Sequence, residues 1–482
     1  AEVKLKEAIE IDKDNPEAHI NYLKMKPMFG GISSKEGIIS LEPEYIDLLE
    51  KFGNSAKVHF LVSSYYQILG FEYLDKSIKH CQEALSLDSE NVNYALTLAY
   101  LYYQSYSLSG KERDIDKAIS LSEEALLYPD SREVKGPRKW ANKSNRIQLS
   151  TLLLNACLSR VLESRWSGLE LGEKKEELLS KAGNYVHDIE QLYGSSDDQQ
   201  VIKWKNILEL AKGNESAAIP KLYELYLKFK ASEKMDSFLY YVLAKEYQDS
   251  SELGASAEFF ASALSLSDRQ VSDRIDKSKP GSILDYSEVL MKLQSYQSAL
   301  GVIDYYEKNY LVTPRSKKLR ADCYIGTSQF DEAEKLLKEL EGQDTELVGV
   351  KMNLLYARIQ KAQSIINRIN LTKDTNASNV LTLESDENKE MSVAAIKSEI
   401  DSYQPKLEAL LNKQIENSRQ LPPMPMVLFL SNHYIKEGNL EKARSLVSRC
   451  IEKDPDNATL LLNQRLLKSE DPLGVSSEEL SS

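Results

Sequence analysis

Residues 427–458, VLFLSNHYIKEGNLEKARSLVSRCIEKDPDNA, read as two amphipathic helices joined by a tight turn. In each helix the apolar and small residues recur at spacings of three and four, which places them on one stripe. Gly438 and Asn439 stand between the two patterns and Pro455 follows the second, because glycine and asparagine favour turns and proline cannot extend a helix. The segment therefore predicts an antiparallel helical hairpin. Its stripes are Val427, Leu430, Ser431 and Tyr434, then Ala443, Val447 and Cys450.

Small residues mark the place where the two helices would cross. Ser431 and Ala443 lie there, and a larger side chain would push the two backbones apart. The whole pattern resembles the tetratricopeptide repeat (TPR), with large, leucine, small and tyrosine positions in the first helix and small, aromatic and small positions in the second. The resemblance implies an all-α fold, an α-solenoid of antiparallel helix–turn–helix repeats wound into a right-handed superhelix, here with irregular insertions.

The same pattern recurs along the chain with different degrees of match. In one copy, Leu61, Ser64, Tyr65 and Ile68 form the first stripe and Ser77, Cys81 and Ala84 the second. Other copies lie at 98–125, 240–263, 283–314 and 317–340, with a weaker one at 204–229. One match would be weak evidence, but about six at hairpin spacing favour a repeat array.

Two regions depart from the pattern. Residues 27–55 contain glycine and proline without a clear helix pair, so we expect a loop and a short helix there. Residues 371–392 are polar and aperiodic, which is typical of a mobile loop, and a long charged helix is expected from Val393 to Asn417. At the ends, residues 1–18 match the second helix of a repeat and 458–468 the first helix of another.

These observations give a predicted organisation. It comprises a partial repeat (1–26), an irregular insertion (27–55), repeats (56–131), a basic loop with a divergent hairpin (132–200), repeats (201–345), irregular helices with a loop near 371–392 (346–425), a C-terminal repeat and the start of another (426–470), and a tail (471–482).

Composition excludes some classes of function. The 482 residues carry 61 Lys and Arg against 74 Asp and Glu, a formal charge of −13, which disfavours binding to nucleic acid. No run of 18 apolar residues occurs, so we expect no membrane insertion. Residue 1 is Ala, and we expect the N-terminus to be processed or truncated, so the sequence assigns no compartment.

No constellation of residues in the sequence predicts chemistry. The five histidines and four cysteines are dispersed without metal-ligand spacing, and the acidic clusters alternate with lysines as on a solvated helix face. No phosphate-binding loop or nucleophile motif is present. We therefore predict no catalytic, cofactor or metal site, and a protein that is not an enzyme.

Residues 131–146, SREVKGPRKWANKSNR, form a basic stretch in an acidic chain. Such a stretch is a candidate site for a carboxylate, a phosphate or an acidic peptide. The alternative is a loop between repeats whose cations balance nearby acids. The candidate residues are Arg132, Lys135, Arg138, Lys139, Lys143 and Arg146.

Tyrosine is abundant, with 27 residues. In the family that the chain resembles, first-helix positions beside the stripe line an inner groove that binds peptides or partner helices. Tyrosine suits such a surface because it offers a large rigid contact with one polar tip. The alternative is packing between adjacent repeats. The predicted partner-binding residues are Tyr66, Tyr103, Tyr106, Tyr241, Lys245 and Asn432.

The sequence leaves three hypotheses for function. The first is a non-catalytic scaffold that binds a protein or peptide in the concave groove. The second is a structural protein that joins copies of itself head to tail through its incomplete terminal repeats. The third is the repeat region of a larger enzyme whose catalytic domain lies outside this chain.

Overall fold

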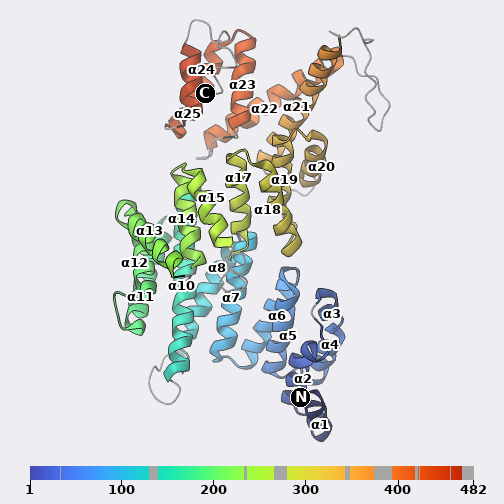
Figure 1. Ribbon diagram of the computed structural model, residues 1–482, viewed down its shortest axis with the longest axis vertical. Coiled ribbons are helices and arrows are strands. Elements are labelled where there is room, and N and C mark those ends of the chain that lie inside the picture. Colours follow the sequence, from blue (N-terminus) through green and yellow to red (C-terminus); the bar gives the residue numbers. More distant parts are fainter. Residues whose placement is uncertain are drawn as a thin grey trace. The chain divides into compact units, whose positions relative to one another are not determined.

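The computed structural model shows an all-α chain, which confirms the predicted class (Figure 1). It describes residues 1–32, 34–129, 139–232, 236–264, 279–341, 348–373, 393–417, 422, 424–455 and 457–468. These residues form helices and turns, with no strand among them. The chain divides into two compact units, Ala1–Val312 and Thr313–Ser482, which are described in turn.

Unit 1 is an array of helical hairpins. It begins with four helices before the regular array: α1 (Glu2–Ile11), α2 (Pro16–Phe29), α3 (Lys35–Ile39) and α4 (Glu42–Phe52). The hairpins are α5 (Ala56–Leu69) with α6 (Leu74–Leu87), α7 (Val92–Ser109) with α8 (Glu112–Ala125), α10 (Lys139–Ser167) with α11 (Glu173–Tyr193), α12 (Gln199–Ala211) with α13 (Glu215–Ala231), α14 (Ser237–Asp249) with α15 (Leu253–Leu264), and α17 (Gly281–Lys292) with α18 (Tyr296–Asn309). A 3₁₀ turn, η1 (Phe71–Tyr73), links α5 to α6.

Small buried residues hold the hairpins together at the predicted crossings. In α5 and α6 the hydroxyls of Ser63 and Ser77 lie 3.0 Å apart, and in the α14–α15 hairpin the Ser256 hydroxyl donates to the Ala244 carbonyl at 2.7 Å. The predicted stripe of α5 was wrong by one residue at two positions. Ser63, and not Ser64, lies at the crossing, and Leu69 is buried while Ile68 is 67% exposed.

The N-terminal region differs from the expectation of one helix over residues 1–18. Helix α1 ends at Ile11, and α2 begins at Pro16 with the Asn15 side chain accepting from the Glu17 amide at 3.0 Å. Proline at the first position of a helix and asparagine before it are both start signals. Residues 27–55 contain the end of α2 and then α3 and α4.

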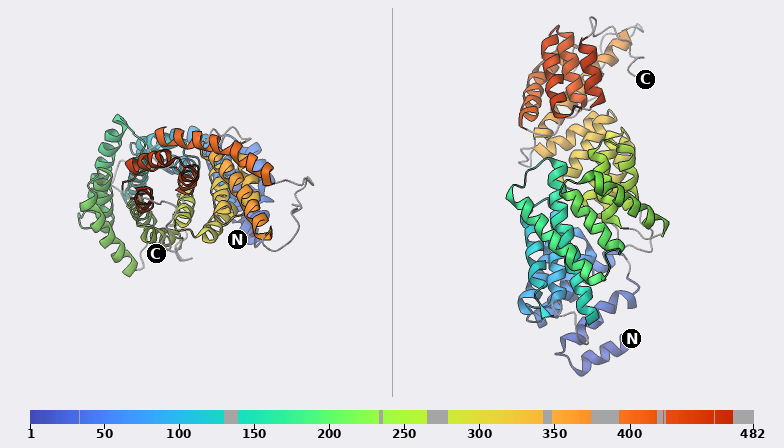
Figure 2. Two further views of the ribbon diagram at one scale, coloured as in Figure 1. Left: turned by 90° about the horizontal axis from the view of Figure 1, so that it is seen from above. Right: turned by 90° about the vertical axis from the view of Figure 1, so that its left-hand side faces the viewer.

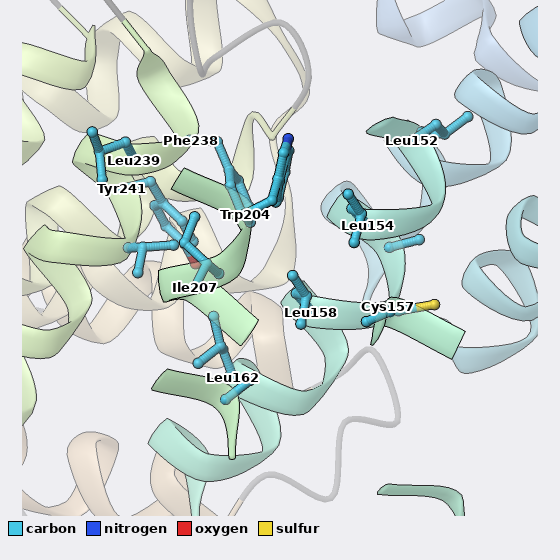
Figure 3. Packing of buried hydrophobic residues seen from close by; sticks show 14 of the residues in the cluster. Leu152, Leu154, Cys157, Leu158, Leu162, Trp204, Ile207, Phe238, Leu239 and Tyr241 are labelled. Atoms are coloured by element: carbon cyan, nitrogen blue, oxygen red, sulfur yellow. The ribbon is translucent and has the colours of Figure 1, made fainter. Parts of the chain in front are cut away.

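Helix α10 is the long central element of unit 1, with 29 residues. It packs against α7, α8, α11 and α12, and its buried apolar residues face helices on both of its sides. Figure 3 shows Leu158 and Leu162 on the side of Ile207, which belongs to α12, while Cys157 points the other way. Trp204 of α12 is 1% exposed and belongs to the same core.

Unit 2 also consists of helical hairpins, and two of its helices, α21 and α22, are 26 and 25 residues long. Val393–Asn417 is a helix as predicted, and α23 with α24 is the hairpin predicted for 427–458. In the predicted loop 371–392, the first three residues belong to α21, and 374–392 lie outside the described residues. The helices are α19 (Pro314–Gly326), α20 (Phe330–Glu341), α21 (Val348–Lys373), α22 (Val393–Asn417), α23 (Met424–Lys436), α24 (Leu440–Lys453) and α25 (Ala458–Lys468).

A candidate binding face on the first helices of unit 1

The first helices of neighbouring hairpins lie side by side in unit 1, as α7, α10 and α12 do (Figures 1 and 2). Where α7, α10 and α14 meet the start of α17, polar side chains from all four come together. We call them the inner-face cluster, which consists of Tyr103, Tyr106, Ser159, Glu163, Tyr241, Lys279 and Asp285.

Lys279 lies at the centre of the inner-face cluster. It directly precedes Pro280 at the start of α17, and it is 5% exposed. Its ammonium group donates to a carboxylate oxygen of Glu163 and lies 3.4 Å from the Ser159 hydroxyl and 4.6 Å from the centre of the Tyr241 ring. A carboxylate, a hydroxyl and an aromatic face are the three kinds of group that stabilise an ammonium ion in a protein.

The other members hold these three groups in place. The Tyr106 hydroxyl donates to the second oxygen of Glu163 at 2.6 Å, and the Tyr103 hydroxyl lies 3.1 Å from the Ser159 hydroxyl. Glu163 is thereby held by both of its oxygens.

Tyr241 is oriented from α17, because its hydroxyl donates to Asp285 at 3.2 Å. The ring that faces the ammonium group is thus fixed at its far end.

The electrostatics of the cluster favour a charged lysine. Burial alone would lower the pKa of Lys279, but the nearby Glu163 and Asp285 carboxylates and the Tyr103 hydroxyl outweigh it and raise that pKa. Burial and the negative charge of Asp285 raise the pKa of Tyr241 well above its ordinary value. The ammonium of Lys279 therefore stays protonated at neutral pH and the tyrosine stays neutral.

A second group of polar residues adjoins the cluster on the α14 side. The indole of Trp166 donates to a carboxylate oxygen of Glu246 at 2.6 Å, and Arg165 forms an ion pair with the same carboxylate. Lys245 lies over the Trp166 ring at 5.7 Å, and the edge of that ring meets Tyr241, with centres 5.9 Å apart. Lys245 and Trp166 are half-buried, so this end of the face reaches solvent.

The hairpins on either side of the cluster approach each other closely. A β-carbon built on Gly281, the first residue of α17, would lie 2.7 Å from the Ser107 carbonyl of α7, so only glycine fits there. The ring of Phe71 contacts that of Tyr310, with centres 5.0 Å apart. Hairpins far apart in the sequence thus pack across the inner face of unit 1.

The predicted groove tyrosines are not on an open surface, which corrects that prediction. Tyr66, Tyr103, Tyr106 and Tyr241 are between 2% and 9% exposed. Tyr66 packs on Tyr65, Tyr73 and His80 and donates to Glu42 at 3.0 Å, while the other three belong to the inner-face cluster. The physical reason is the close packing of hairpins across the inner face, and the alternative of packing between repeats fits these side chains.

The two other predicted partner-binding residues do reach solvent. Lys245 is half-buried beside Trp166, and Asn432 of α23 is exposed. They belong to different units. Their role in binding stays a prediction.

The basic stretch 131–146 is only partly described. Arg132, Lys135 and Arg138 lie outside the described residues, and so does the side chain of Lys139, whose backbone begins α10. Lys143 also lies on α10.

Arg146 is engaged within the fold. It forms a two-pronged ion pair with Asp188 of α11, with nitrogen–oxygen distances of 2.6 and 2.8 Å, and Ser150 donates to the same carboxylate at 2.8 Å. The prediction that Arg146 binds an external anion is therefore corrected, because its guanidinium already binds a carboxylate of the chain.

The structure also brings together two histidines that the sequence keeps 21 residues apart. The Nδ1 atoms of His59 and His80 lie 3.2 Å from each other, and His59 Nε2 lies 2.9 Å from the Gly53 carbonyl. Burial and the charge of His59 lower the pKa of His80 to about 4. His80 is therefore neutral at physiological pH, and the two rings form a packing contact between α5 and α6.

Other chemistry is limited in the part of the chain that the structure describes. The four cysteines are buried, and burial raises the pKa of the thiols of Cys81, Cys157 and Cys323 to about 12. Among the described residues, no group of three metal-ligating side chains is found, and none of their helices is long and apolar enough to cross a membrane.

The fold and its hairpin crossings define an α-helical repeat protein built of antiparallel helical hairpins. No protein-family model matches the chain, and no curated protein does. The solved structures that are similar to it include the following two. One is a chain of the APC/C hetero-tetramer Cut9–Hcn1, with 10% identity, 97% of this chain and 93% of that chain covered, and a TM-score of 0.34. The other is the P58(IPK) TPR domain, with 13% identity, 82% and 98% covered, and a TM-score of 0.23.

Proposed function

We propose that this chain is a non-catalytic scaffold that binds a protein partner on the inner face of unit 1. The observation that carries the proposal is the row of adjacent first helices, which exposes the pair Trp166 and Lys245 at the rim of a buried polar cluster. A repeat array provides an extended surface of this kind because each hairpin adds one helix to the row.

The chemistry of the rim suits protein recognition. Tryptophan, tyrosine and arginine carry much of the binding energy in protein interfaces, since they combine a large apolar area with a polar group. Here Trp166 is fixed by its hydrogen bond to Glu246 and by the edge contact with Tyr241. A pre-oriented aromatic ring loses little conformational freedom when a partner covers it.

Head-to-tail assembly remains an alternative. Helix α1 has no buried residue and exposes Val3 (68%) and Ile11 (86%), an apolar surface that a second copy could cover. Light scattering over a concentration series tests it, because assembly requires the mass to rise with concentration. The larger-enzyme hypothesis stays a prediction.

The test of the scaffold proposal compares two charge reversals. Lys245→Glu changes the inner face, and Lys228→Glu changes an exposed lysine of α13, a second helix, whose side chain is 57% exposed and paired with Glu224. Partners are first recovered with the unchanged protein and then titrated against both variants. We expect Lys245→Glu to weaken binding at least about tenfold, the cost of losing a single strong interface contact, and Lys228→Glu to leave it unchanged.

Thermal unfolding of both variants controls for folding. Equal affinity of the two variants for every recovered partner, or an effect of Lys228→Glu alone, would contradict the proposed face.

A further inference from the structure

We propose that the inner-face cluster is a recognition pocket for a lysine side chain, that Lys279 is its intramolecular occupant, and that a lysine of the protein partner competes for it. The inference rests on the proposed function, since it names the group by which the partner is recognised. It also makes a claim about the pocket alone that is tested without any partner.

The pocket offers an ammonium group two hydrogen-bond acceptors and the face of an aromatic ring. Such a group has three donors and no acceptor. The cluster supplies the Glu163 carboxylate, the Ser159 hydroxyl at 3.4 Å and the face of the Tyr241 ring at 4.6 Å. A guanidinium is flat and pairs best with two oxygens of one carboxylate, but here the second Glu163 oxygen already accepts from Tyr106 at 2.6 Å. The geometry therefore favours lysine over arginine.

The negative charge of the carboxylates in the pocket favours a cation as its occupant. Two carboxylates, Glu163 and Asp285, act on Lys279. Two other cations of α10 already have partners: Arg160, which is 4% exposed, forms ion pairs with Glu112 and Asp116, and Arg165 pairs with Glu215 and Glu246. Without the ammonium of Lys279, the half-buried carboxylate of Glu163 would lose its ion-pair partner, and an external ammonium would replace that partner.

The pocket is reachable from the rim. The Glu163 side chain is 28% exposed, whereas Lys279 is almost fully buried. Tyr241 is shared by the two groups of residues, since its ring centre lies 4.6 Å from the Lys279 ammonium and 5.9 Å from the centre of the Trp166 ring. A partner that covers Trp166 and Lys245 thus lies next to the carboxylate that would bind its lysine.

The position of Lys279 allows the side chain to be removed without breaking a helix. It stands before the first residue of α17, and its described backbone bond is the Ser282 amide donating to its carbonyl at 3.0 Å, which any residue can accept. Lys279→Ala removes three methylene groups and the ammonium, and propylammonium contains those same atoms.

The experiment is a rescue of the Lys279→Ala full-length chain by propylammonium chloride. We expect the variant to unfold at a lower temperature than the unchanged protein. Propylammonium at up to about 100 mM, a range suited to so small a ligand, is expected to recover about half of the loss. Equal concentrations of 1-propanol and of sodium chloride should not recover the loss. The 1-propanol control tests whether the propyl chain alone fills the space, and the sodium chloride control tests whether salt screening alone stabilises the variant. The unchanged protein, whose pocket is filled, should gain nothing.

A second variant identifies the group that binds the ammonium. In Lys279→Ala/Glu163→Gln the carboxylate is gone, and the rescue should disappear. A folded Lys279→Ala chain that propylammonium does not stabilise would overturn the proposal. So would equal stabilisation by 1-propanol, which would make Lys279 a structural contact and nothing more.

If Lys279→Ala does not fold, the lysine pocket is tested instead on chains that keep Lys279. Acetylation of Lys279 by an amine-reactive reagent is measured by mass spectrometry as a ratio to Lys228, which is 57% exposed and serves as an internal standard. The ratio should be at least about threefold higher in Glu163→Gln than in the unchanged protein, because the carboxylate that holds the Lys279 ammonium is gone. A ratio that does not change would overturn the proposal.

The experiments distinguish rejection of the lysine pocket from rejection of partner binding at the inner face. Loss of rescue with a normal effect of Lys245→Glu rejects the lysine pocket and retains the scaffold. Once a partner is in hand, Lys279→Ala should bind it several times more tightly, because the intramolecular competitor is gone. Unchanged affinity would reject recognition of the partner by its lysine.

Discussion

Arg165→Ala is expected to lower the free energy of unfolding of unit 1 by about 3 to 5 kcal/mol. Arg165 forms an ion pair with the carboxylate of Glu246, which is 5% exposed, and a second one with Glu215 at 3.0 Å. Removal of the arginine leaves a buried carboxylate with only the Trp166 indole as an observed donor. Chemical denaturation followed by circular dichroism measures the loss.

The loss should depend on pH in a definite direction. Burial raises the pKa of Glu246 even with Arg165 present, and Arg165 opposes that rise. Without Arg165 the pKa rises further, so the folded state binds more protons than the unfolded state and stability falls as pH increases. Arg165→Ala should therefore cost more at pH 8 than at pH 5.5.

Two variants control this prediction. Arg165→Ala/Glu246→Gln should recover much of the loss and its pH dependence, because no buried charge remains. Lys228→Ala breaks an ion pair with Glu224 in which both side chains are exposed, 57% and 66%, and should cost less than about 1 kcal/mol. A cost of Arg165→Ala as small as that of Lys228→Ala would contradict the burial of this ion pair.

Trp204→Ala is expected to cost about 3 to 5 kcal/mol, the usual effect of deleting a large core aromatic. Trp204 is 1% exposed in the core between α10, α12 and α14, where its ring lies 5.5 Å from that of Phe238 (Figure 3). The change removes this packing and leaves a cavity. Denaturant unfolding of the full chain measures it, with the unfolding of unit 1 followed separately from that of unit 2 where two transitions occur.

The matched control is Tyr223→Ala on α13. Its side chain is 40% exposed, so we expect a cost below about 1 kcal/mol although the residue is also aromatic. If the two substitutions were equally costly, the assignment of Trp204 to the core would be wrong.

The hairpins were predictable because their signal is local. The stripe of a helix and the turn that follows it lie within about 30 residues, as in α23 and α24, and the Val393–Asn417 helix follows from spacing alone. The register was less certain. In α5 both Ile68 and its neighbour Leu69 are apolar, and packing, which the sequence does not display, decides that Leu69 is the buried one.

The start of α2 was within reach of sequence reasoning. Asn15 followed by Pro16 is a helix start signal, but the prediction treats residues 1–18 as one helix. The repeat resemblance favoured one helix where two are formed.

The inner-face cluster could not be predicted from the sequence. Lys279 binds Glu163, which is 116 residues away, and Gly281 meets Ser107 of α7. These contacts depend on the rotation between each hairpin and the next along the array. That rotation adds up from many small packing angles, and no local sequence motif encodes it. The tyrosines predicted to line a groove are buried, and Tyr103, Tyr106 and Tyr241 are buried within this cluster.

Site-specific photocrosslinking tests the central claim most directly. A photoreactive amino acid is placed at position 245 on α14 or, as the control, at position 228 on α13, and the protein is irradiated with its partners present. The account predicts that a partner is crosslinked from position 245 and not from position 228, and that added Trp166→Ala reduces the yield. Crosslinking from position 228 alone, or from neither position while the partner still co-purifies, would contradict binding at the inner face.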